Sequence, residues 1–416
     1  MRIPETLSKA FGPSPDFETF LSGFLNDEKL LPEPGALKSK RFLTRSIAPH
    51  IERLSALFNR ENQDQGDPLG AYWKKGTHPE NLRLAYFLYF MPANLFRIAS
   101  IWAELSRLGF QWKAGDLRGV EFGAGPASGA TGIATGEKFC PVGIPKLGNW
   151  ALIEQDAATL GLGGRWANAY FQHLGKSEWK VKEFPRKIDL SLGFLPPKAP
   201  KFNLWLMSFF LNELPTPRKE LADLLLDSWK HHLENEGVVI LVEPALKQQS
   251  RKLLELRREL LEKIQKEKLD DFKILLPCLG HQNCGALASP EDWCHEDVSW
   301  WRPPYYKQLD EIVELDRKSL PFSYLVITRS KRSRSEILPI PGNSQTHRLV
   351  SPAHSEGQDL EFFTCGQDGK RRARLRPALK SPVTPDEGLQ RGDILLEAEI
   401  RGDQNSSRVQ RLKARV

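Results

Sequence analysis

The stretch LRGVEFGAG, residues 117–125, decides the fold, because a short apolar strand runs directly into two glycines. Glycines at the end of a first strand let the backbone turn tightly and approach a ligand closely. Three later stretches read as buried strands: WALIEQD (150–156), FNLWLMSFFL (202–211) and GVVILVEP (237–244). Amphipathic, helix-like stretches separate them. Buried strands spaced by helices predict a parallel, doubly wound α/β sheet.

Composition shifts divide the chain around this alternation. They indicate an N-terminal helical region at 1–76, an α/β domain at 77–330, a basic linker at 331–346 and a small basic β domain at 347–416. Within the α/β domain, the residues from 77 onward predict a buried helix pair or a helix kinked at Pro92. Short alternating strands with Gly/Asp turns predict an OB-like barrel for the last domain.

The composition excludes several classes of protein. The chain has 416 residues, of which 40% are hydrophobic, enough for a substantial core and too many for wholesale disorder. No run of 18 uncharged apolar residues exists, so no membrane span is expected. The first residues lack a signal-peptide pattern, and five cysteines are too few for a disulfide scaffold. We therefore expect a soluble, cytoplasmic protein, monomeric and without a membrane partner.

The charge is uneven. Residues 331–416 hold 16 Lys and Arg against 11 Asp and Glu, so most of the net charge of +7 lies there. A basic tail favours a phosphate-bearing partner such as nucleic acid, and the run Lys370–Arg376 is expected to contact phosphates. A solvated basic surface explains the same count equally well.

The glycine turn carries the first functional motif. Gly123 and Gly125 let a ligand approach, and Glu154 ends the next strand, where an acidic side chain can accept hydrogen bonds from ribose hydroxyls. Glu121 precedes the glycines, and an acidic residue there suits a cationic ligand without phosphates, namely S-adenosylmethionine. Ordinary solvation of strand ends is the alternative explanation for both glutamates.

The second motif follows the buried strand at 202–211. Asn212 and Glu213 come where the strands of a doubly wound sheet face the ligand crevice, so they are candidate catalytic groups. Capping of the following helix is the equal alternative. The Asn/Asp-Pro-Pro-aromatic sequence of amino-directed methyltransferases is missing here, and no cysteine stands nearby for covalent attack on a pyrimidine.

The third motif gathers potential metal ligands in a loop at 277–295. Its members are Cys278, Cys284, Cys294, His281 and His295. Cys365 stands seventy positions further on, in the basic tail. Three cysteines within 17 residues indicate a metal centre, and their spacing leaves zinc and iron–sulfur both open.

With these motifs in order, the chain resembles the small-ribosomal-subunit methyltransferase-like family, which comprises the mitochondrial small-subunit assembly factor and its bacterial relatives. The resemblance runs from about Tyr86 to Asp393. It is carried by AYFLYFMPANLF, EFGAGP, SFFLNELP, LVEP, PC-x5-C with DWCH, FSYLVITR, and C-x2-DGK-x-RR followed by RGD.

This resemblance implies a class I methyltransferase fold that binds S-adenosylmethionine. It also implies a 4Fe–4S cluster held by Cys278, Cys284, Cys294 and Cys365, and the small ribosomal subunit or its rRNA as partner. Two departures from the family pattern stand out. Ala127 replaces the third motif glycine, and residues 128–149 are too rich in Gly and Pro for the usual long first helix.

Two functions remain open. The first is an rRNA-directed methyltransferase that positions cofactor and acceptor for methyl transfer. The second is a non-catalytic assembly or RNA-binding protein that keeps the fold, for which a structural zinc site is the alternative metal centre.

Overall fold

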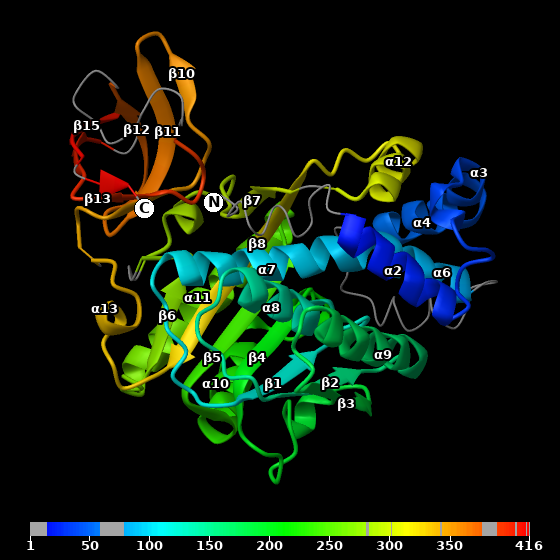
Figure 1. Cartoon of the computed structure of the whole chain (residues 1–416). Coiled ribbons are helices and arrows are strands. Elements are labelled where there is room, and N and C mark those ends of the chain that lie inside the picture. The colour runs from blue at the N-terminus through cyan, green and yellow to red at the C-terminus, as the bar shows by residue number, and fades with distance from the viewer. Residues whose placement is uncertain are drawn as a thin grey trace.

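The structure, a computed structural model of the chain, describes residues 15–58, 79–279, 283–300, 302–341, 343–376, 389–403, 406–412 and 414–415. Two β-sheets organise these residues (Figure 1). The first lies at the centre with helices on both faces. The second forms a small separate body at one end of the molecule.

The first sheet contains the glycine turn. Its strands are β1 (Leu117–Phe122), β2 (Gly148–Glu154), β3 (Trp179–Pro185), β4 (Phe202–Ser208), β5 (Leu233–Pro244), β6 (Phe272–Leu276), β7 (Glu296–Ser299) and β8 (Ser319–Arg329). They run in the order β3-β2-β1-β4-β5-β8-β6, with β7 paired to β8. This is the strand order of a class I methyltransferase fold, so the expected fold class is confirmed.

The prediction that all strands are parallel is wrong for β8, which pairs antiparallel with β5, β6 and β7. Between β6 and β8 the chain stays at the carboxyl edge of the parallel strands, where it forms the cysteine loop, β7 and α12 (Pro304–Ile312). Strand β8 therefore enters the sheet from that edge and runs back. Its sequence alone carries no information about this direction.

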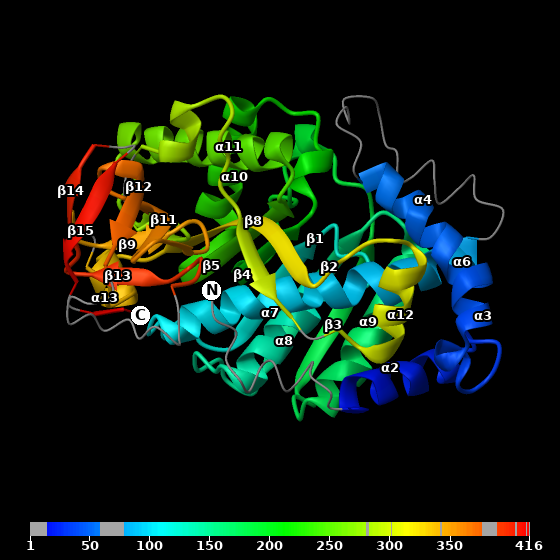
Figure 2. The same cartoon turned by 90° about the horizontal axis from the view of Figure 1, so that it is seen from above.

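Helices cover both faces of the sheet (Figure 2). On one face lie α7 (Met91–Arg107), α8 (Ser128–Phe139) and α9 (Ala157–His173), and on the other α10 (Arg218–His232) and α11 (Lys247–Lys266). Because side chains alternate along a strand, Leu204 and Leu206 enter the core under α7 and α8. Trp205 and Met207 enter the core under α10 and α11.

Helix α8 corrects the expectation drawn from the Gly- and Pro-rich segment, since twelve of its residues are helical. Two of its three glycines, Gly132 and Gly136, face α7 closely. A Cβ on Gly132 would lie 2.7 Å from Ile98 Cβ, and one on Gly136 would lie 2.6 Å from Trp102 Cβ. The glycines therefore let α7 and α8 approach more closely than side chains would allow.

The N-terminal helices are α2 (Pro15–Asp27), α3 (Lys40–Phe42), α4 (Ala48–Phe58) and α6 (Pro79–Ala85). Helix α6 continues into α7 through one π-helical turn, Tyr86–Phe90, just before Pro92. That turn accommodates the missing N–H of the proline without ending the helix. By length and composition Glu80–Arg107 resembles a membrane span, but 94% of its most apolar window is buried in the protein, as in a core helix.

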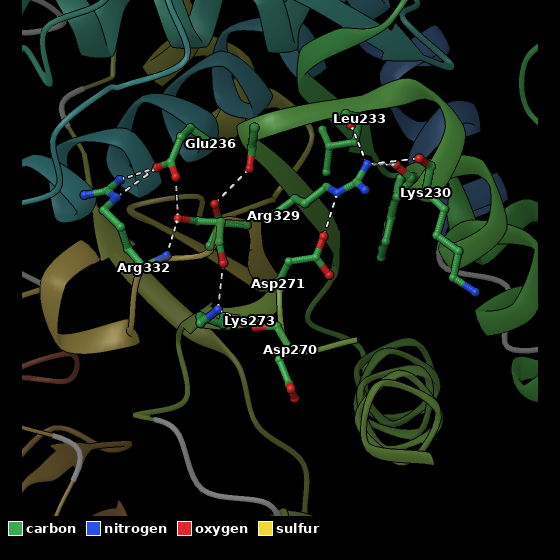
Figure 3. A network of polar contacts seen from close by, with 12 residues as sticks. Lys230, Leu233, Glu236, Asp270, Asp271, Lys273, Arg329 and Arg332 are labelled. Atoms are coloured by element: carbon green, nitrogen blue, oxygen red, sulfur yellow. Dashed lines mark hydrogen bonds and ion pairs between the residues drawn. The ribbon is translucent and has the colours of Figure 1, made fainter. Parts of the chain in front are cut away.

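A polar network fixes the edge of the sheet opposite the glycine turn (Figure 3). Arg329 donates to Asp271 Oδ2 at 2.8 Å and to the carbonyl oxygens of Lys230 and Leu233 at 2.9 and 3.0 Å. These carbonyls lie at the C-terminal end of α10, where a cation is favourable. The network therefore connects α10 to β6 and β8. The opposite edge of the sheet, where the glycine turn lies, is formed by loops.

The predicted linker at 331–346 contains a short helix, α13 (Arg334–Ile337). Ile337, Leu338 and Ile340 are at most 3% exposed and belong to the core under α7. Apolar side chains in this otherwise polar segment thus anchor it to the first domain.

The second sheet comprises β9 (His347–Leu349), β10 (His354–Glu356), β11 (Asp359–Gly366), β12 (Gly369–Leu375), β13 (Ile394–Leu396), β14 (Glu399–Gly402), β15 (Ser407–Arg411) and β16 (Ala414–Arg415). Its order is β14-β15-β12-β11-β9-β13-β16, and β12 and β15 are parallel. The structure gives this domain as one eight-stranded sheet. Its closure into the OB-like barrel expected from the sequence stays a prediction, and we keep the name barrel for the domain.

Candidate functional site

A cavity of about 1150 Å³ opens at the carboxyl edge of the first sheet. The loops after β1, β2, β4 and β5 all contribute to its wall. It is the crevice in which doubly wound sheets bind ligands. Of the predicted cofactor and catalytic residues, those that line it are Gly123, Gly125, Glu154, Asn212 and Glu213.

The glycine turn has the backbone that its sequence predicts. Gly123 has φ 63° and Gly125 has φ 48°, both in the left-handed region that favours glycine. A Cβ on Gly123 would lie 2.7 Å from the ring of Phe210. Ala127, at the position of the missing third glycine, also has a positive φ, 58°. The turn thus keeps its shape with alanine there, at some conformational cost.

Glu154 joins the first two strand ends. Its carboxylate accepts N–H bonds from Gly125 at 3.1 Å, Gln155 at 2.8 Å and Asp156 at 3.1 Å. Burial raises the pKa of Glu154, and these three bonds oppose the rise. The carboxylate therefore holds the glycine turn in place while it lines the cavity, and oxygen lone pairs remain for a ligand hydroxyl.

Glu121 was predicted to contact the cofactor, but it is not among the residues that line the cavity. Its side chain is 1% exposed and accepts N–H bonds from Gly129 and Ala130, both at 2.9 Å. It thus holds the first turn of α8, behind the cavity wall rather than in it. Burial raises its pKa to about 8. Because the same acidic position can serve a ligand or a helix end, the sequence could not distinguish the two roles.

Asn212 and Glu213 lie in a single 3₁₀ turn after β4 and line the cavity. Capping of the next helix does not explain them, since α10 begins at Arg218 with Pro217 before it. The residue that fixes their turn is Glu243, which accepts the N–H groups of Leu211 and Asn212 at 2.9 and 3.1 Å. The sequence analysis missed this role, although an acidic residue at the end of a buried strand was its signal.

The four predicted metal ligands come together at a second, smaller cavity of about 40 Å³. The residues concerned are Cys278, Cys284, Cys294 and Cys365. The first three belong to the loop between β6 and β7, and Cys365 lies on β11 of the barrel. No disulfide joins the five cysteines, all of which are among the described residues.

The electrostatics of this smaller cavity suit thiolates shared with a cation. Burial, followed by the neighbouring thiols, raises the pKa of Cys294. The charge of a Cys278 thiolate favours the protonated guanidinium of Arg334, whose Nε and Nη1 atoms have no hydrogen-bond partner in the described structure. Such a buried guanidinium is stabilised by negative charge on the sulfur ligands.

Among the described residues, no group of three or more Cys, His, Asp or Glu converges closely enough to hold a single metal ion. His281, one candidate for a zinc site, lies outside them. The other, His295, stacks its ring on Trp293 with centroids 6.0 Å apart. Both of these residues line the large cavity as well as the thiol cavity, so they form a wall shared by the two.

The basic run at Lys370–Arg376 forms most of β12, and carboxylates of neighbouring segments pair with it. Arg372 and Arg374 bind Glu361, and Arg376 binds Asp359. These cross-strand ion pairs partly neutralise the surface that the sequence suggested for phosphates. Its contact with RNA stays a prediction.

Comparison with solved structures found loose likenesses at low sequence identity. The plantazolicin methyltransferase BpumL with SAH is 15% identical, with a TM-score of 0.34 over 68% of this chain and 99% of its own. The O-methyltransferase TomG from Streptomyces achromogenes with SAM is 12% identical, with a TM-score of 0.30 over 75% and 98%. The O-methyltransferase from Bacillus cereus with SAH is 10% identical, with a TM-score of 0.27 over 75% and 99%. Because these identities and TM-scores are low, the fold assignment rests on the strand order.

No curated protein matches the chain in sequence. One family model does, over residues 83–378, and its description is mitochondrial small ribosomal subunit Rsm22. The match covers well over half of the chain and confirms the resemblance seen in the motifs. The chain belongs to the Rsm22 family, whose description names the small ribosomal subunit.

Proposed function

We propose that this protein binds S-adenosylmethionine in the large cavity and acts on the small ribosomal subunit through its rRNA. The observation that carries the proposal is the joining of Gly125 and Glu154 at the carboxyl edge of the sheet, with the N–H of one on the carboxylate of the other. A left-handed glycine turn lets the protein backbone approach the ligand closely. The carboxylate at the end of β2 offers an acceptor for ribose hydroxyls.

The charge of the cavity supports a cationic cofactor. Glu154 and Glu213 line it beside the glycine turn, which itself carries no lysine or arginine. The other charged groups on this part of the wall include Asp156, which pairs with Arg83, and Asp189, Arg186 and Lys187. The two glutamates favour a sulfonium-bearing ligand at the glycine turn over a pyrophosphate. Bound there, S-adenosylmethionine supplies an electrophilic methyl group. Asn212 and Glu213 lie in the same wall and can position a nucleophilic acceptor.

Whether turnover occurs separates the two functions that the sequence left open, a methyltransferase and a methyltransferase-like assembly factor. Transfer of radiolabelled methyl from S-adenosylmethionine to small subunits purified from cells lacking the protein tests it. Incorporation that disappears with Asn212→Ala supports the enzyme. Tight subunit binding without incorporation supports the assembly factor.

We also propose that Cys278, Cys284, Cys294 and Cys365 hold a 4Fe–4S cluster. Four thiols around one cavity, with the buried guanidinium of Arg334 favoured by the charge of a Cys278 thiolate, match the four-thiolate set that such clusters use. Zinc held by local cysteines and His295 is the competing occupant.

One preparation tests both proposals. The protein is purified anaerobically, its metals are measured, and the same sample is titrated with S-adenosylmethionine in a calorimeter. We expect about four irons per chain and saturable binding of one cofactor. A colourless protein with one zinc contradicts the cluster, and a flat titration contradicts the cofactor assignment.

A further inference from the structure

The large cavity has two cationic side chains, Arg97 and Arg317, to which the proposed function has assigned no role. At about 1150 Å³ it exceeds the usual range of ligand pockets, roughly 300–1,000 Å³. The loops after β2, β3 and β4 bring both carboxylates and the cations Arg186 and Lys187 to its wall. Helix α7 and the segment before β8 bring the guanidiniums of Arg97 and Arg317, with Asp316 beside the latter.

Arg97 is the central observation. Its side chain lies on α7, is 6% exposed and yet faces the cavity. One guanidinium nitrogen donates to Asn94 Oδ1 at 2.8 Å, while Nε has no acceptor in the described structure. The guanidinium lies 5.5 Å from the centre of the Phe209 ring. A buried donor without an acceptor is costly unless a ligand supplies one.

Arg317 adds a second cation at the same wall. Its guanidinium lies over the rings of Tyr89 and Phe90, at 5.0 and 5.3 Å from their centres. Burial, and then the charge of Arg317, lowers the pKa of Arg97 to about 9. Arg97 therefore remains protonated at neutral pH, and the two cations at this wall repel each other.

The carboxylates nearby do not neutralise this pair. Asp297 attracts Arg97 at a distance, without a hydrogen bond to it. Asp316 forms ion pairs with Arg302 and Lys318. Asp310 accepts from Tyr89 and from Arg302. In the described part of the chain, no carboxylate side chain hydrogen-bonds to the guanidinium of Arg97 or Arg317.

We propose that Arg97 and Arg317 form an oxyanion subsite that holds a carboxylate or phosphate group of the bound ligand. The inference rests on the proposed function and deepens it, because it assigns these two guanidiniums to a named group of the bound ligand. The oxyanion has two possible sources: the amino-acid end of S-adenosylmethionine, or a phosphate of the RNA acceptor. A planar guanidinium with an open Nε suits either one.

Calorimetry on the full-length protein tests the subsite with four probes. S-adenosylhomocysteine and 5′-methylthioadenosine share a nucleoside, but only the first carries the amino-acid carboxylate. Cytidine 5′-monophosphate and cytidine, titrated into protein saturated with S-adenosylhomocysteine, differ only in the phosphate. The variants are Arg97→Gln and Arg317→Gln. The matched control is Arg118→Gln, since Arg118 pairs with Glu234 away from the cavity.

If the carboxylate is the source, Arg97→Gln weakens S-adenosylhomocysteine about 10- to 100-fold, the scale of a charged hydrogen bond, and leaves 5′-methylthioadenosine unchanged. If the phosphate is the source, the same loss appears for cytidine 5′-monophosphate and not for cytidine. Wild-type affinity for all four probes in both cavity variants overturns the subsite.

Two further outcomes are separable. Should Arg97→Gln fail to fold, Arg317→Gln decides, because Arg317 is only half-buried. Should the wild type bind neither adenosine probe, the cofactor proposal fails. The nucleotide pair, titrated without S-adenosylhomocysteine, then decides the subsite alone: selective loss of cytidine 5′-monophosphate binding supports it, and an effect no larger than that of Arg118→Gln overturns it.

Discussion

At the scale of single residues, the site is organised by buried carboxylates that accept backbone N–H groups. Glu121, Glu154 and Glu243 each sit at or near the end of a strand and hold the loop that follows or adjoins it. The sequence located all three strand ends. It could not say which carboxylate faces the ligand, because that depends on how each side chain turns relative to the adjoining loop.

The first residue-scale prediction concerns Glu154. Glu154→Gln replaces one acceptor oxygen by a donor, so we expect S-adenosylmethionine to bind about 1.5–3 kcal/mol more weakly, the value of a charged hydrogen bond. Titration calorimetry measures the change. Glu183→Gln, on the exposed part of β3, is the control and is expected to bind as the wild type does. Equal affinity for both variants would remove Glu154 from the site.

The second residue-scale prediction is a pH dependence. Burial raises the pKa of Glu243 from its ordinary 4.5 to about 8, against the N–H bonds that it accepts. Between those values the folded protein binds a proton that the unfolded chain has lost, so the free energy of unfolding falls as the pH rises from about 5 to 8. In Glu243→Gln this fall is expected to be shallower. Urea unfolding at four pH values measures it, and identical slopes would show that Glu243 is ionised throughout.

At the scale of elements, α8 shows what a composition argument leaves out. Its glycines and the nearby prolines suggested that no long helix would follow β1, since glycine weakens helices by about 1 kcal/mol each. Packing against α7 outweighs that penalty. The signal was present, because Gly132 and Gly136 are spaced four apart and therefore share one helix face. The reversed strand β8 had no comparable signal in the sequence.

The element-scale prediction tests this close packing. In Gly132→Ala the new Cβ would lie 2.7 Å from both Ile98 Cβ and the carbonyl oxygen of Leu95, so α7 must shift. We expect a net loss of about 1–2 kcal/mol in unfolding free energy, after the gain in helix propensity. Gly23→Ala is the control, because its helical position has open space around it. That variant should be more stable by about 0.5–1 kcal/mol, and the same gain in Gly132→Ala would refute close packing.

At the scale of the whole molecule, the barrel is fastened to the first domain by charge as well as by cysteines. Arg348 of β9 donates to Glu104 of α7 at 2.5 Å and to Glu296 of β7 at 3.0 Å, and all three side chains are at most 3% exposed. Lys370 of β12 binds both carboxylate oxygens of Asp292 at 2.7 Å. The sequence predicted the cysteine link, but ion pairs between residues 52 to 244 positions apart left no local pattern.

The first whole-molecule prediction removes the buried cation. Arg348→Met leaves Glu296 buried without its cation, and it leaves Glu104 with only Arg107 at 3.6 Å and the Tyr324 hydroxyl. Removing one member of a buried ion pair typically costs about 3–5 kcal/mol. We expect the barrel to detach, with faster hydrogen exchange over 331–341 and β9. Arg401→Met is the matched control, because Arg401 is an exposed arginine of the same barrel paired with Glu399. Unchanged exchange in Arg348→Met would mean that other contacts suffice to hold the barrel.

The last prediction concerns the link through Cys365. The loop between β6 and β7 carries three of the thiols and also binds Lys370 through Asp292, so a cluster completed by Cys365 joins two surfaces that already touch. The free energy of cluster binding then also holds the two domains together, since neither domain supplies all four cysteines. Cys365→Ser should lose the brown colour and its iron while the buried ion pairs keep the barrel docked, so the iron content falls before protease resistance does. Cys140→Ser, which changes a buried cysteine away from the thiol cavity, should keep both the iron and the protease resistance.

Combined with Arg348→Met, Cys365→Ser should expose the 331–341 segment to protease more than either change alone. Full iron content in Cys365→Ser would instead confine the metal to the first domain and leave the ion pairs as the fastening between the two.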